Sequence, residues 1–459
     1  MIPEQGNMSS TAASESRLQP LLQGSIPPML LRLAGPNVVA MSLMTAVTIA
    51  DALYVGQLGT MPLASLALVF PFQTLMQMMA AGAIGGGVTS SVARALGGDS
   101  QEQASEVAWH GVIIGGFGAL AYMVVLGAFA RPIFDLLGGT GQALEGAVLY
   151  AAIAFGGAAA TWAFYVFSAI LRGTGDTVIP ARAIVAGSVI QVVLSGVLTL
   201  GWGPFPGLGI AGPAIAMIVC HGGAALYLVL CLARGGAAVR LRPCRIRTAP
   251  IADILKVGGI GLINSVTVAV TVVVVTGVVG RYGTEALAGY GLGARLELTL
   301  TPIAFGIGAA LTAAVGVNVG AEQFARARRI AWTGAGMTFL VTGLIGLVAA
   351  LFPGLWLDWF TGDPAAYGYG LLYLGIVAPF YGLFGGGQAL YFASQGTGRL
   401  VWPVSVGVVR FLVVSATGMA ALAFGWPLEA VFAGVSAGLA ITGIGLALCL
   451  LGPEWRSRV

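Results

Sequence analysis

Long apolar stretches separated by short polar connections recur along the chain from residue 26 onwards. A transmembrane helix needs about 20 mostly apolar residues. Twelve stretches of this kind are centred near residues 42, 75, 118, 157, 190, 220, 265, 301, 340, 379, 412 and 440. The pattern therefore predicts an all-α integral membrane protein with twelve transmembrane helices.

The second half of the chain repeats the first half at an offset of about 224 residues. Three pairs of segments align: Gly56–Ala64 with Gly280–Ala288, Trp109 with Trp332, and Arg172–Asp176 with Gln395–Arg399. Asp51 falls on Val275, so the halves share a scaffold but not this charge. Because six helices return the chain to its starting side, we expect two six-helix bundles of the same topology, related by an axis along the membrane normal.

Basic residues set the expected orientation, since Lys and Arg concentrate in the cytoplasmic loops of membrane proteins. The longest basic connection runs from Arg234 to Lys256, and placing it in the cytoplasm puts both termini there as well. The polar residues at the start lack the basic segment and apolar core of a signal peptide. We therefore expect a disordered cytoplasmic tail at 1–25, bundles at 26–234 and 252–459, and a cytoplasmic linker at 235–251. The absence of organelle targeting fits a bacterial plasma (inner) membrane.

Composition excludes several classes of protein. Charged residues make up 8% of the chain, whereas an ordinary soluble domain carries about 25%. The net charge of +4 reflects membrane topology and does not indicate nucleic-acid binding. The four cysteines and two histidines lack metal-ligand spacing, so we expect no metal and no cofactor. The Gly-rich segments at 172–176 and 396–399 follow no strand and lack the full P-loop pattern, which excludes nucleotide-driven transport.

Asp51 is an acid inside the first predicted helix, about two turns before its outer end. A carboxylate inside a bilayer costs at least about 2.5–3.5 kcal/mol at a helix centre, so such residues usually mark an ion pathway, a proton relay or a buried pair. Asp51 is therefore the first candidate for a protonatable site. The structural alternative is that its side chain only hydrogen-bonds neighbouring helices or faces water on the outer side.

Two further charges need an explanation in the second half. Glu297 lies in the eighth predicted helix and Arg410 in the eleventh, while Arg295 points to a different side of its helix from Glu297. A Glu297–Arg410 pair, buried and structural, is one interpretation. The other makes Glu297 a second protonatable site or a contact for a cationic substrate.

Polar and aromatic residues within the helices predict a cavity. Gln73, Met76 and Gln77 share one helix face at i, i+3 and i+4, and Tyr381 and Gln388 lie in the tenth helix. Thioethers repack and aromatic faces attract organic cations, so these residue types suit an adaptable binding site. Helix packing and anchoring at the lipid interface are the alternative explanation for the aromatic residues.

Five stretches of the chain together resemble the multidrug and toxic compound extrusion (MATE) family. They are Ile49–Gly59 with Leu63 and Ala64, Gly82–Gly87 with Ala93–Gly97, Leu171–Thr177 with Pro180, Gly316–Ala321 with Arg326 and Arg328, and Gln395–Arg399 with Pro403. The resemblance spans nearly the whole chain after residue 25. It implies two six-helix bundles facing each other in a V, which export organic cations or other amphiphiles against a proton or sodium gradient.

The same resemblance implies a role for Asp51, which stands where the family has a cation-coupling acid in helix one. One branch of the family adds an Asn-x-x-x-Asp arrangement in helix five, where this chain has Gln191 and Ser195. Other members use a Glu in helix seven, where this chain offers Asn264. These departures argue against a preformed sodium site with several carboxylates. The implied coupling set is Asp51, Gln191 and Ser195, with a proton or sodium as the coupling ion.

The hypothesis that follows is a secondary antiporter coupled through Asp51 and acting as a monomer on small cationic or amphiphilic substrates, with membrane lipid around it. The predicted substrate cavity contains Gln73, Met76, Gln77, Asn264, Glu297, Tyr381 and Gln388. A flippase for lipid-linked precursors is the near rival, although only Arg295 and Arg410 are basic residues deep within helices. An intramembrane enzyme and a passive channel are the alternatives of other classes. The enzyme would need a clustered catalytic set that the sequence does not show.

Overall fold

The computed structural model describes residues 18–202, 206–234, 238–360, 363–452 and 455. Most of the predicted cytoplasmic tail, at 1–17, and residues 235–237 of the predicted linker lie outside the described residues. The last part of the predicted tail is not disordered, because residues 18–23 are helical. Leu21 is buried there, and the Asn318 side-chain amide donates to its carbonyl oxygen at 3.1 Å. The buried side chain of Leu21 and the hydrogen bond to its carbonyl oxygen explain why this segment is ordered.

The first half of the described chain forms six spans. They are α2 (Ile26–Gln57); the continuous run of α3 (Thr60–Gln77), the π-helix η1 (Met78–Ile84) and α4 (Gly85–Gly97); α5 (Gln101–Ala128); the bent pair α7 (Gly141–Gly156) and α8 (Ala158–Gly173); α9 (Val178–Leu200); and α10 (Ala211–Ala233). A short helix, α6 (Ala130–Leu136), connects α5 to α7.

The second half of the described chain repeats this arrangement. Its spans are α11 (Thr248–Gly280); α12 (Thr284–Gly320); α13 (Phe324–Leu351); the run of α15 (Pro364–Val377), the 3₁₀ turn η2 (Ala378–Phe380) and α16 (Tyr381–Thr397); α17 (Val401–Phe424); and α18 (Leu428–Cys449). The short helix α14 (Gly354–Leu357) connects α13 to α15.

The twelve-helix prediction is confirmed within the described residues. Eleven helices are long and apolar enough to cross a membrane, and α7 with α8 makes a twelfth span that is bent by 46°. Every predicted centre falls inside one of these spans. The centre near 157 coincides with the break between α7 and α8, and the centre near 379 falls in η2.

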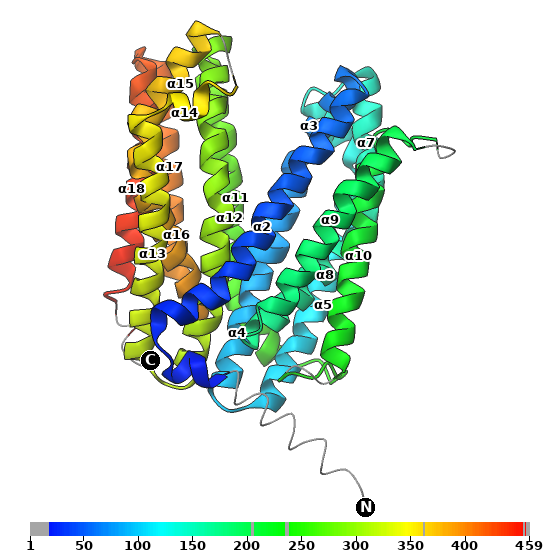
Figure 1. Ribbon diagram of the computed structural model, residues 1–459, viewed down its shortest axis with the longest axis vertical. Helices are drawn as coiled ribbons and strands as arrows, with labels where there is room; N and C mark the ends of the chain where they lie inside the picture. The colour runs from blue at the N-terminus through cyan, green and yellow to red at the C-terminus, as the bar shows by residue number, and fades with distance from the viewer. Residues whose placement is uncertain (1–17, 203–205, 235–237, 361–362, 453–454, 456–459) are drawn as a thin grey trace, which may run out of the picture.

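The two groups of helices form a V (Figure 1). Helices α11 to α18 make one arm, and α3 to α10 make the other, while α2 runs from the converging end into the second arm. The N-terminal segment and the C-terminal end both lie at the converging end. The predicted facing of two bundles in a V is therefore confirmed.

Backbone conformation repeats between the halves as well as sequence. Positive φ angles occur at four matched pairs: Gly59 (116°) with Gly283 (120°), Asp99 (57°) with Glu322 (60°), Gly175 (81°) with Gly398 (79°), and Gly201 (82°) with Gly425 (65°). Left-handed backbone is rare for residues with a side chain. Its occurrence at matching acidic positions, Asp99 and Glu322, shows that both halves make the same turn before α5 and α13.

Glycines let the two arms approach closely at the converging end. A Cβ on Gly87 of α4 would lie 2.6 Å from the carbonyl oxygen of Ile254 on α11. Cβ atoms on Gly97 of α4 and Gly320 of α12 would collide with backbone carbonyls of the facing helix. Close backbone approach through small residues is the usual packing mode of helices in lipid. The chain contains 71 glycines, and these three allow helices of the two halves to pack closely at the converging end.

Candidate functional site

Asp51 is buried on α2, with 8% of its surface exposed. The Ser195 hydroxyl on α9 donates to its Oδ1 at 2.5 Å, and the Gln191 side chain is also within hydrogen-bonding reach of the carboxyl group. Gly196 makes this pairing possible, because a Cβ there would lie 3.0 Å from the ring of Tyr54 on α2. The three residues of the predicted coupling set thus lie together between α2 and α9.

A polar cavity of about 40 Å³ opens beside Asp51. Its lining includes Asp51, Gln191, Gln73, Gln77, Ser188 and His221, together with apolar residues of α2, α8, α9 and α10. Drug-sized ligands occupy pockets of about 300–1,000 Å³, whereas this volume suits an ion or a few water molecules. The cavity is therefore a candidate ion site and is too small for an organic substrate.

Gln73 fixes one wall of this cavity. Its side-chain amide nitrogen lies 3.0 Å from the sulfur of Met217 on α10, and its amide oxygen accepts from the Tyr150 hydroxyl at 3.4 Å. Tyr150 is fully buried on α7. Gln73 of α3 is thus tied to α7 and α10 within the first half. Gln77 lines the same cavity one helical turn further along.

The sequence analysis did not predict every polar residue of the site; His221 and Ser188 are two that it left out. His221 was considered only as a metal ligand, yet it lines the cavity, contacts Thr161 through Nδ1 at 3.0 Å and stacks on Phe164. Ser188 stands on α9 one turn before Gln191. The spacing 188, 191, 195 places these polar side chains on one helix face, a signal that could have revealed Ser188.

Met76 does not line this cavity. Its side chain is fully buried in the hydrophobic core of the first half, which includes Val69, Ala80 and Ile84. The prediction grouped Met76 with Gln73 and Gln77 because one helix turn brings them to a common side. In the structure, Met76 packs into the core between helices, while the two glutamines reach the cavity.

Glu297 and Arg410 do not form the predicted direct ion pair. Glu297 on α12 accepts from the Tyr373 hydroxyl on α15 at 2.9 Å, and none of its oxygens comes within 4.0 Å of an Arg410 nitrogen. Arg410 is buried on α17, and its Cγ lies 3.2 Å from where Gly438 of α18 would carry a Cβ. Its stem packs toward α18 while Glu297 turns to Tyr373, so the two charges interact only at longer range.

The remaining predicted cavity residues lie in the second half. Tyr381 is fully buried at the start of α16, and no hydrogen-bond partner within the described chain meets its hydroxyl. The Asn264 amide oxygen lies 2.8 Å from where Gly407 of α17 would carry a Cβ, and Gln388 is half-buried on α16. None of them lines the Asp51 cavity. The structure therefore separates the predicted set into the Asp51 site and residues of the second half, of which Tyr381 interacts with Glu297.

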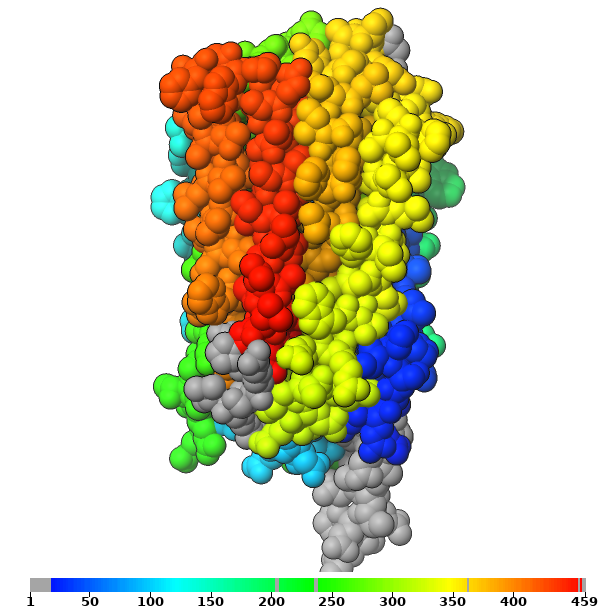
Figure 2. All heavy atoms as spheres, turned by 90° about the vertical axis from the view of Figure 1, so that its left-hand side faces the viewer, coloured from blue at the N-terminus to red at the C-terminus, as the bar shows by residue number. Residues whose placement is uncertain are grey.

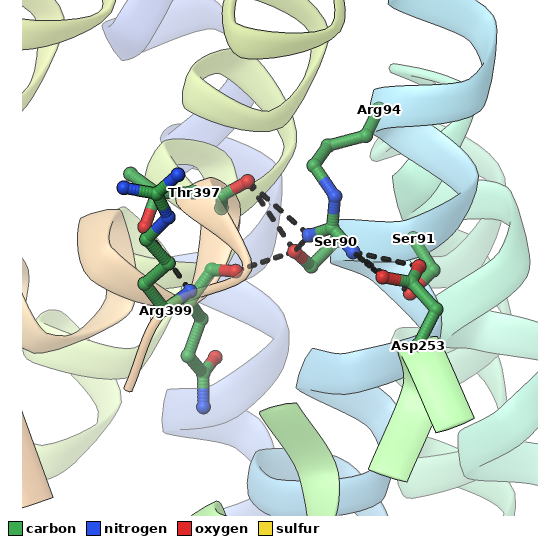
Figure 3. A network of polar contacts seen from close by, with 8 residues as sticks. Ser90, Ser91, Arg94, Asp253, Thr397 and Arg399 are labelled. Carbon is green, nitrogen blue, oxygen red and sulfur yellow. Dashed lines mark hydrogen bonds and ion pairs between the residues drawn. The ribbon is translucent and has the colours of Figure 1, made fainter. Parts of the chain in front are cut away.

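A third polar cluster joins the arms at their converging end (Figure 3). Arg94 of α4 donates to both carboxylate oxygens of Asp253 on α11, at 2.8 and 2.7 Å. Ser90, one turn before Arg94, donates to the carbonyl oxygen of Gln395 on α16. The Gln395 side chain in turn donates to the carbonyl oxygen of Gly82 at 2.9 Å. Helices of both halves are thus held together by charge-assisted and backbone hydrogen bonds.

A family model described as MatE matches residues 36–197 and matches a second time over residues 262–419. The two matches correspond to the two repeats and together cover most of the chain. The chain belongs to the MATE family. It is therefore a membrane transporter and not an enzyme, which removes the intramembrane-enzyme alternative.

Curated relatives of this MATE transporter carry more than one description. The FAD transporter of Shewanella oneidensis is 27% identical, over 80% of this chain and 81% of its own. The Deinococcus radiodurans relative, named a probable multidrug resistance protein NorM, is 27% identical over 91% of this chain and 93% of its own. The chain is thus similar both to proteins named as probable multidrug resistance proteins and to one named an FAD transporter.

Solved structures share the fold of this MATE transporter. The Vibrio cholerae MATE transporter VcmN in the bent form is 20% identical, with a TM-score of 0.84 over 97% of this chain and 98% of its own. A MOP superfamily transporter from Pyrococcus furiosus is 23% identical, with a TM-score of 0.87 over 94% and 97%. At such identities the likeness establishes the architecture alone.

Across the part of the chain that the structure describes, no three His, Cys, Asp or Glu side chains are grouped so that they could hold a metal ion. His221 and Cys220 both line the Asp51 cavity, but adjacent residues on one helix point in different directions. The cavity lining therefore offers a single acidic side chain, Asp51, among neighbouring polar groups.

Proposed function

We propose that this MATE transporter is a secondary antiporter that exports organic cations or amphiphilic molecules in exchange for protons bound at Asp51. The observation that carries the proposal is the burial of one carboxyl group in a small polar cavity, with Ser195 donating to it. An acid held inside a bilayer usually belongs to an ion pathway or proton relay. Asp51 is the single acid in the cavity lining.

The cavity favours a proton over sodium as the coupling ion. A proton neutralises a single carboxylate without further ligands. A sodium ion would need several oxygen atoms around it. The cavity lining carries one carboxyl group, and its other side-chain oxygen atoms belong to uncharged hydroxyl and amide groups, on Thr48, Gln73, Gln77, Ser188 and Gln191. The volume of about 40 Å³ still admits a sodium ion coordinated by these side chains, so an imposed sodium gradient belongs in the experiment.

Helix α2 offers a route from the coupling site to the rest of the molecule. In its outer part, Asp51 contacts α9. Its inner part packs closely on α12: a Cβ on Gly306 of α12 would lie 2.7 Å from the backbone nitrogen of Val38. Pro36 lies between its start and these contacts. Protonation that changes the α2–α9 contact would therefore bias the relative position of the two arms, provided that the two states differ in proton affinity.

The site is complete within one chain, so we take a monomer as the functional unit. Both termini and the arginine-rich linker are placed on the cytoplasmic side, since Lys and Arg concentrate there. The diverging end of the V then faces outward (Figure 1). In a bacterium this membrane would be the plasma (inner) membrane.

The test is transport of a fluorescent organic cation by the purified full-length protein in proteoliposomes, under separately imposed pH and sodium gradients. We expect a pH gradient to drive transport, and Asp51→Asn to reduce the driven component to the rate of protein-free liposomes. Glu297→Gln is the matched control, because it removes an intramembrane acid that lies outside the Asp51 cavity. Its driven transport should be retained.

Three outcomes would change the proposal. Full driven transport by Asp51→Asn, with loss in Glu297→Gln, would move the coupling site to the second half. Transport driven only by sodium would replace the proton with a sodium ion held by Asp51, Gln191 and Ser195. FAD serves as a second substrate because a relative is named an FAD transporter. Exchange of FAD without any cation would overturn the proposed substrate class.

A further inference from the structure

The first turns of α5 and α13 occupy matching positions in the two repeats but differ in charge. Trp109 of α5 aligns with Trp332 of α13. At the same offset, Ser105, Glu106 and His110 align with Arg328, Arg329 and Thr333. An acid in the first half is thus replaced by an arginine in the second. The backbone is the same in the two repeats, but the side chains at these positions carry opposite charges. The two positions are therefore expected to bind groups of opposite charge.

In the first half this place is filled by the linker between the bundles. Ser105 accepts from the Arg240 backbone N–H at 3.1 Å, and His110 Nε2 accepts from the Arg247 backbone N–H at 2.9 Å. The Arg247 guanidinium lies 3.4 Å from a Glu106 carboxylate oxygen. The basic linker therefore supplies the positive charge that pairs with Glu106.

In the second half the N-terminal segment takes the equivalent path but leaves a pocket. Arg326 donates to the carbonyl oxygens of Leu21 at 3.2 Å and Gly24 at 2.5 Å, which holds the segment against α13. A pocket of about 890 Å³ remains beside it, with Ser25, Arg328, Arg329 and Trp332 in its lining. Within the described residues, no carboxylate forms an ion pair with Arg328 or Arg329.

The positive charges in this pocket are therefore crowded without a countercharge from the described chain. Arg329 lies close enough to Arg326 for their charges to repel each other. Arginine binds phosphate through a planar fork of N–H donors and is more weakly hydrated than lysine. An anion in the pocket would relieve this repulsion and accept from the guanidinium groups of Arg328 and Arg329, which form no ion pair within the described chain.

The pocket opens beside a surface suited to acyl chains. Trp332 is 42% exposed, as is typical of a tryptophan at the membrane interface. Further along α13, Phe339, Leu340 and Leu344 are exposed apolar side chains. In the space-filling view, the first turns of α13 lie between the N-terminal segment and the end of α18 (Figure 2). Arginines at the start of the helix could contact the phosphate of a phospholipid, and the apolar face that follows them could contact its acyl chains.

We propose that this pocket binds the phosphate group of an anionic phospholipid, with Arg328 and Arg329 contacting the phosphate and Trp332 lying against the start of an acyl chain. Basic pockets at the cytoplasmic ends of transmembrane helices bind such headgroups. The site is distinct from the Asp51 cavity and does not depend on the nature of the coupling ion. A free phosphate ion offers the same anionic oxygens, so the experiment must separate the two sources.

The experiment is native mass spectrometry of the full-length protein in detergent, titrated with phosphatidylglycerol or with zwitterionic phosphatidylethanolamine. We expect a saturable first phosphatidylglycerol adduct, whose apparent Kd rises about tenfold in the Arg328→Gln/Arg329→Gln variant. The matched control is Arg242→Gln/Arg245→Gln, which removes two exposed arginines from the linker on the same side of the molecule. Its apparent Kd should equal that of the unsubstituted protein.

Three results would overturn the proposal. Equal weakening in both double variants would indicate a general charge effect, and equal binding of phosphatidylethanolamine would remove the requirement for an anionic lipid. Displacement of the adduct by millimolar inorganic phosphate would assign the pocket to the free ion. Thermal unfolding without added lipid shows whether the variants are folded. Stabilisation by phosphatidylglycerol, present in the unsubstituted protein and lost only in Arg328→Gln/Arg329→Gln, is the second expected readout.

Discussion

At the scale of single residues, the pairing of Asp51 with Ser195 is the feature with most chemical consequence. The hydroxyl donates to the carboxyl group across two helices at 2.5 Å. A hydrogen bond to a charged group contributes about 1.5–3 kcal/mol, more than a neutral pair. Ser195 therefore orients the carboxyl group and holds α9 against α2. Gln191 and Ser188 add polar groups on the same face of α9.

Ser195→Ala should impair gradient-driven transport, because it removes the hydroxyl that holds the carboxyl group in place. Ser195→Thr keeps a hydroxyl at the same position and should restore most of the driven rate. The measurement is driven efflux of an organic cation in proteoliposomes. Ser405→Ala is the control, since the Ser405 hydroxyl donates to the carbonyl oxygen of Val401 in its own helix and to no other acceptor within the described residues. If Ser195→Ala and Ser405→Ala behave alike, the hydroxyl has no part in coupling.

At the scale of elements, backbone contact between glycine-bearing helices sets the geometry of the converging end. On α4, a Cβ at position 87 would meet the Ile254 carbonyl oxygen at 2.6 Å and the Gly258 nitrogen at 3.0 Å. Both neighbours belong to the backbone of α11, so no side chain can rotate away. Helices α4 and α11 must separate to admit even one methyl group. Their spacing is therefore specified by the absence of a side chain.

Gly87→Ala should destabilise the protein by about 1–3 kcal/mol, the usual cost of forcing an extra carbon into a packed contact. The control is Gly336→Ala on α13, where nothing lies within 4 Å of the added Cβ. That change should be neutral or stabilising, since alanine favours the helix over glycine by about 0.5–1 kcal/mol. Thermal unfolding in detergent, compared between the two variants, measures the difference. Equal melting temperatures would mean that α4 and α11 are not packed as described.

At the scale of the whole molecule, the polar cluster at the converging end ties one arm of the V to the other. In the Arg94–Asp253 pair a single guanidinium nitrogen, Nη2, contacts both carboxylate oxygens, and the two side chains are 16% and 45% exposed. Because the pair is partly exposed and screened by salt, its contribution to stability is limited to about 1 kcal/mol. That is still a several-fold effect on an equilibrium between two arrangements of the arms. The pair acts with the close glycine contacts to keep this end together.

Arg94→Gln should raise the population in which the converging end is open, by about two- to fivefold. Distances between spin labels on α3 and α15, at the diverging end, report the change in reconstituted protein. Arg131→Gln is the matched control, because it breaks an exposed ion pair with Glu145 that lies wholly within the first half. The double variant with Asp253→Asn should open no further than Arg94→Gln alone, as expected for one shared interaction. Additive effects would contradict the direct pairing.

The sequence by itself determined the spans and the duplication, and it singled out Asp51 as the candidate coupling acid. Each of these depends on local composition. A transmembrane helix needs about 20 mostly apolar residues. These residues are consecutive in the sequence, so each span can be recognised without knowledge of the fold. The duplication is visible as matched segments, and the structure repeats it in backbone conformation at positions such as Asp99 and Glu322. Asp51 stood out because an acid within an apolar stretch is energetically costly.

Only the tertiary structure decided which polar residues meet. His221 joins the Asp51 cavity from α10, and Met76 is withdrawn into the core, because the rotation of each helix depends on its neighbours. Glu297 takes Tyr373 as its partner, since α12 and α15 approach closely where Gly293 leaves room for the Tyr373 ring. A helix in lipid is apolar nearly all round, so hydrophobic periodicity does not fix its rotation. Glycine contacts and interhelical hydrogen bonds do, and they form only when distant segments are brought together.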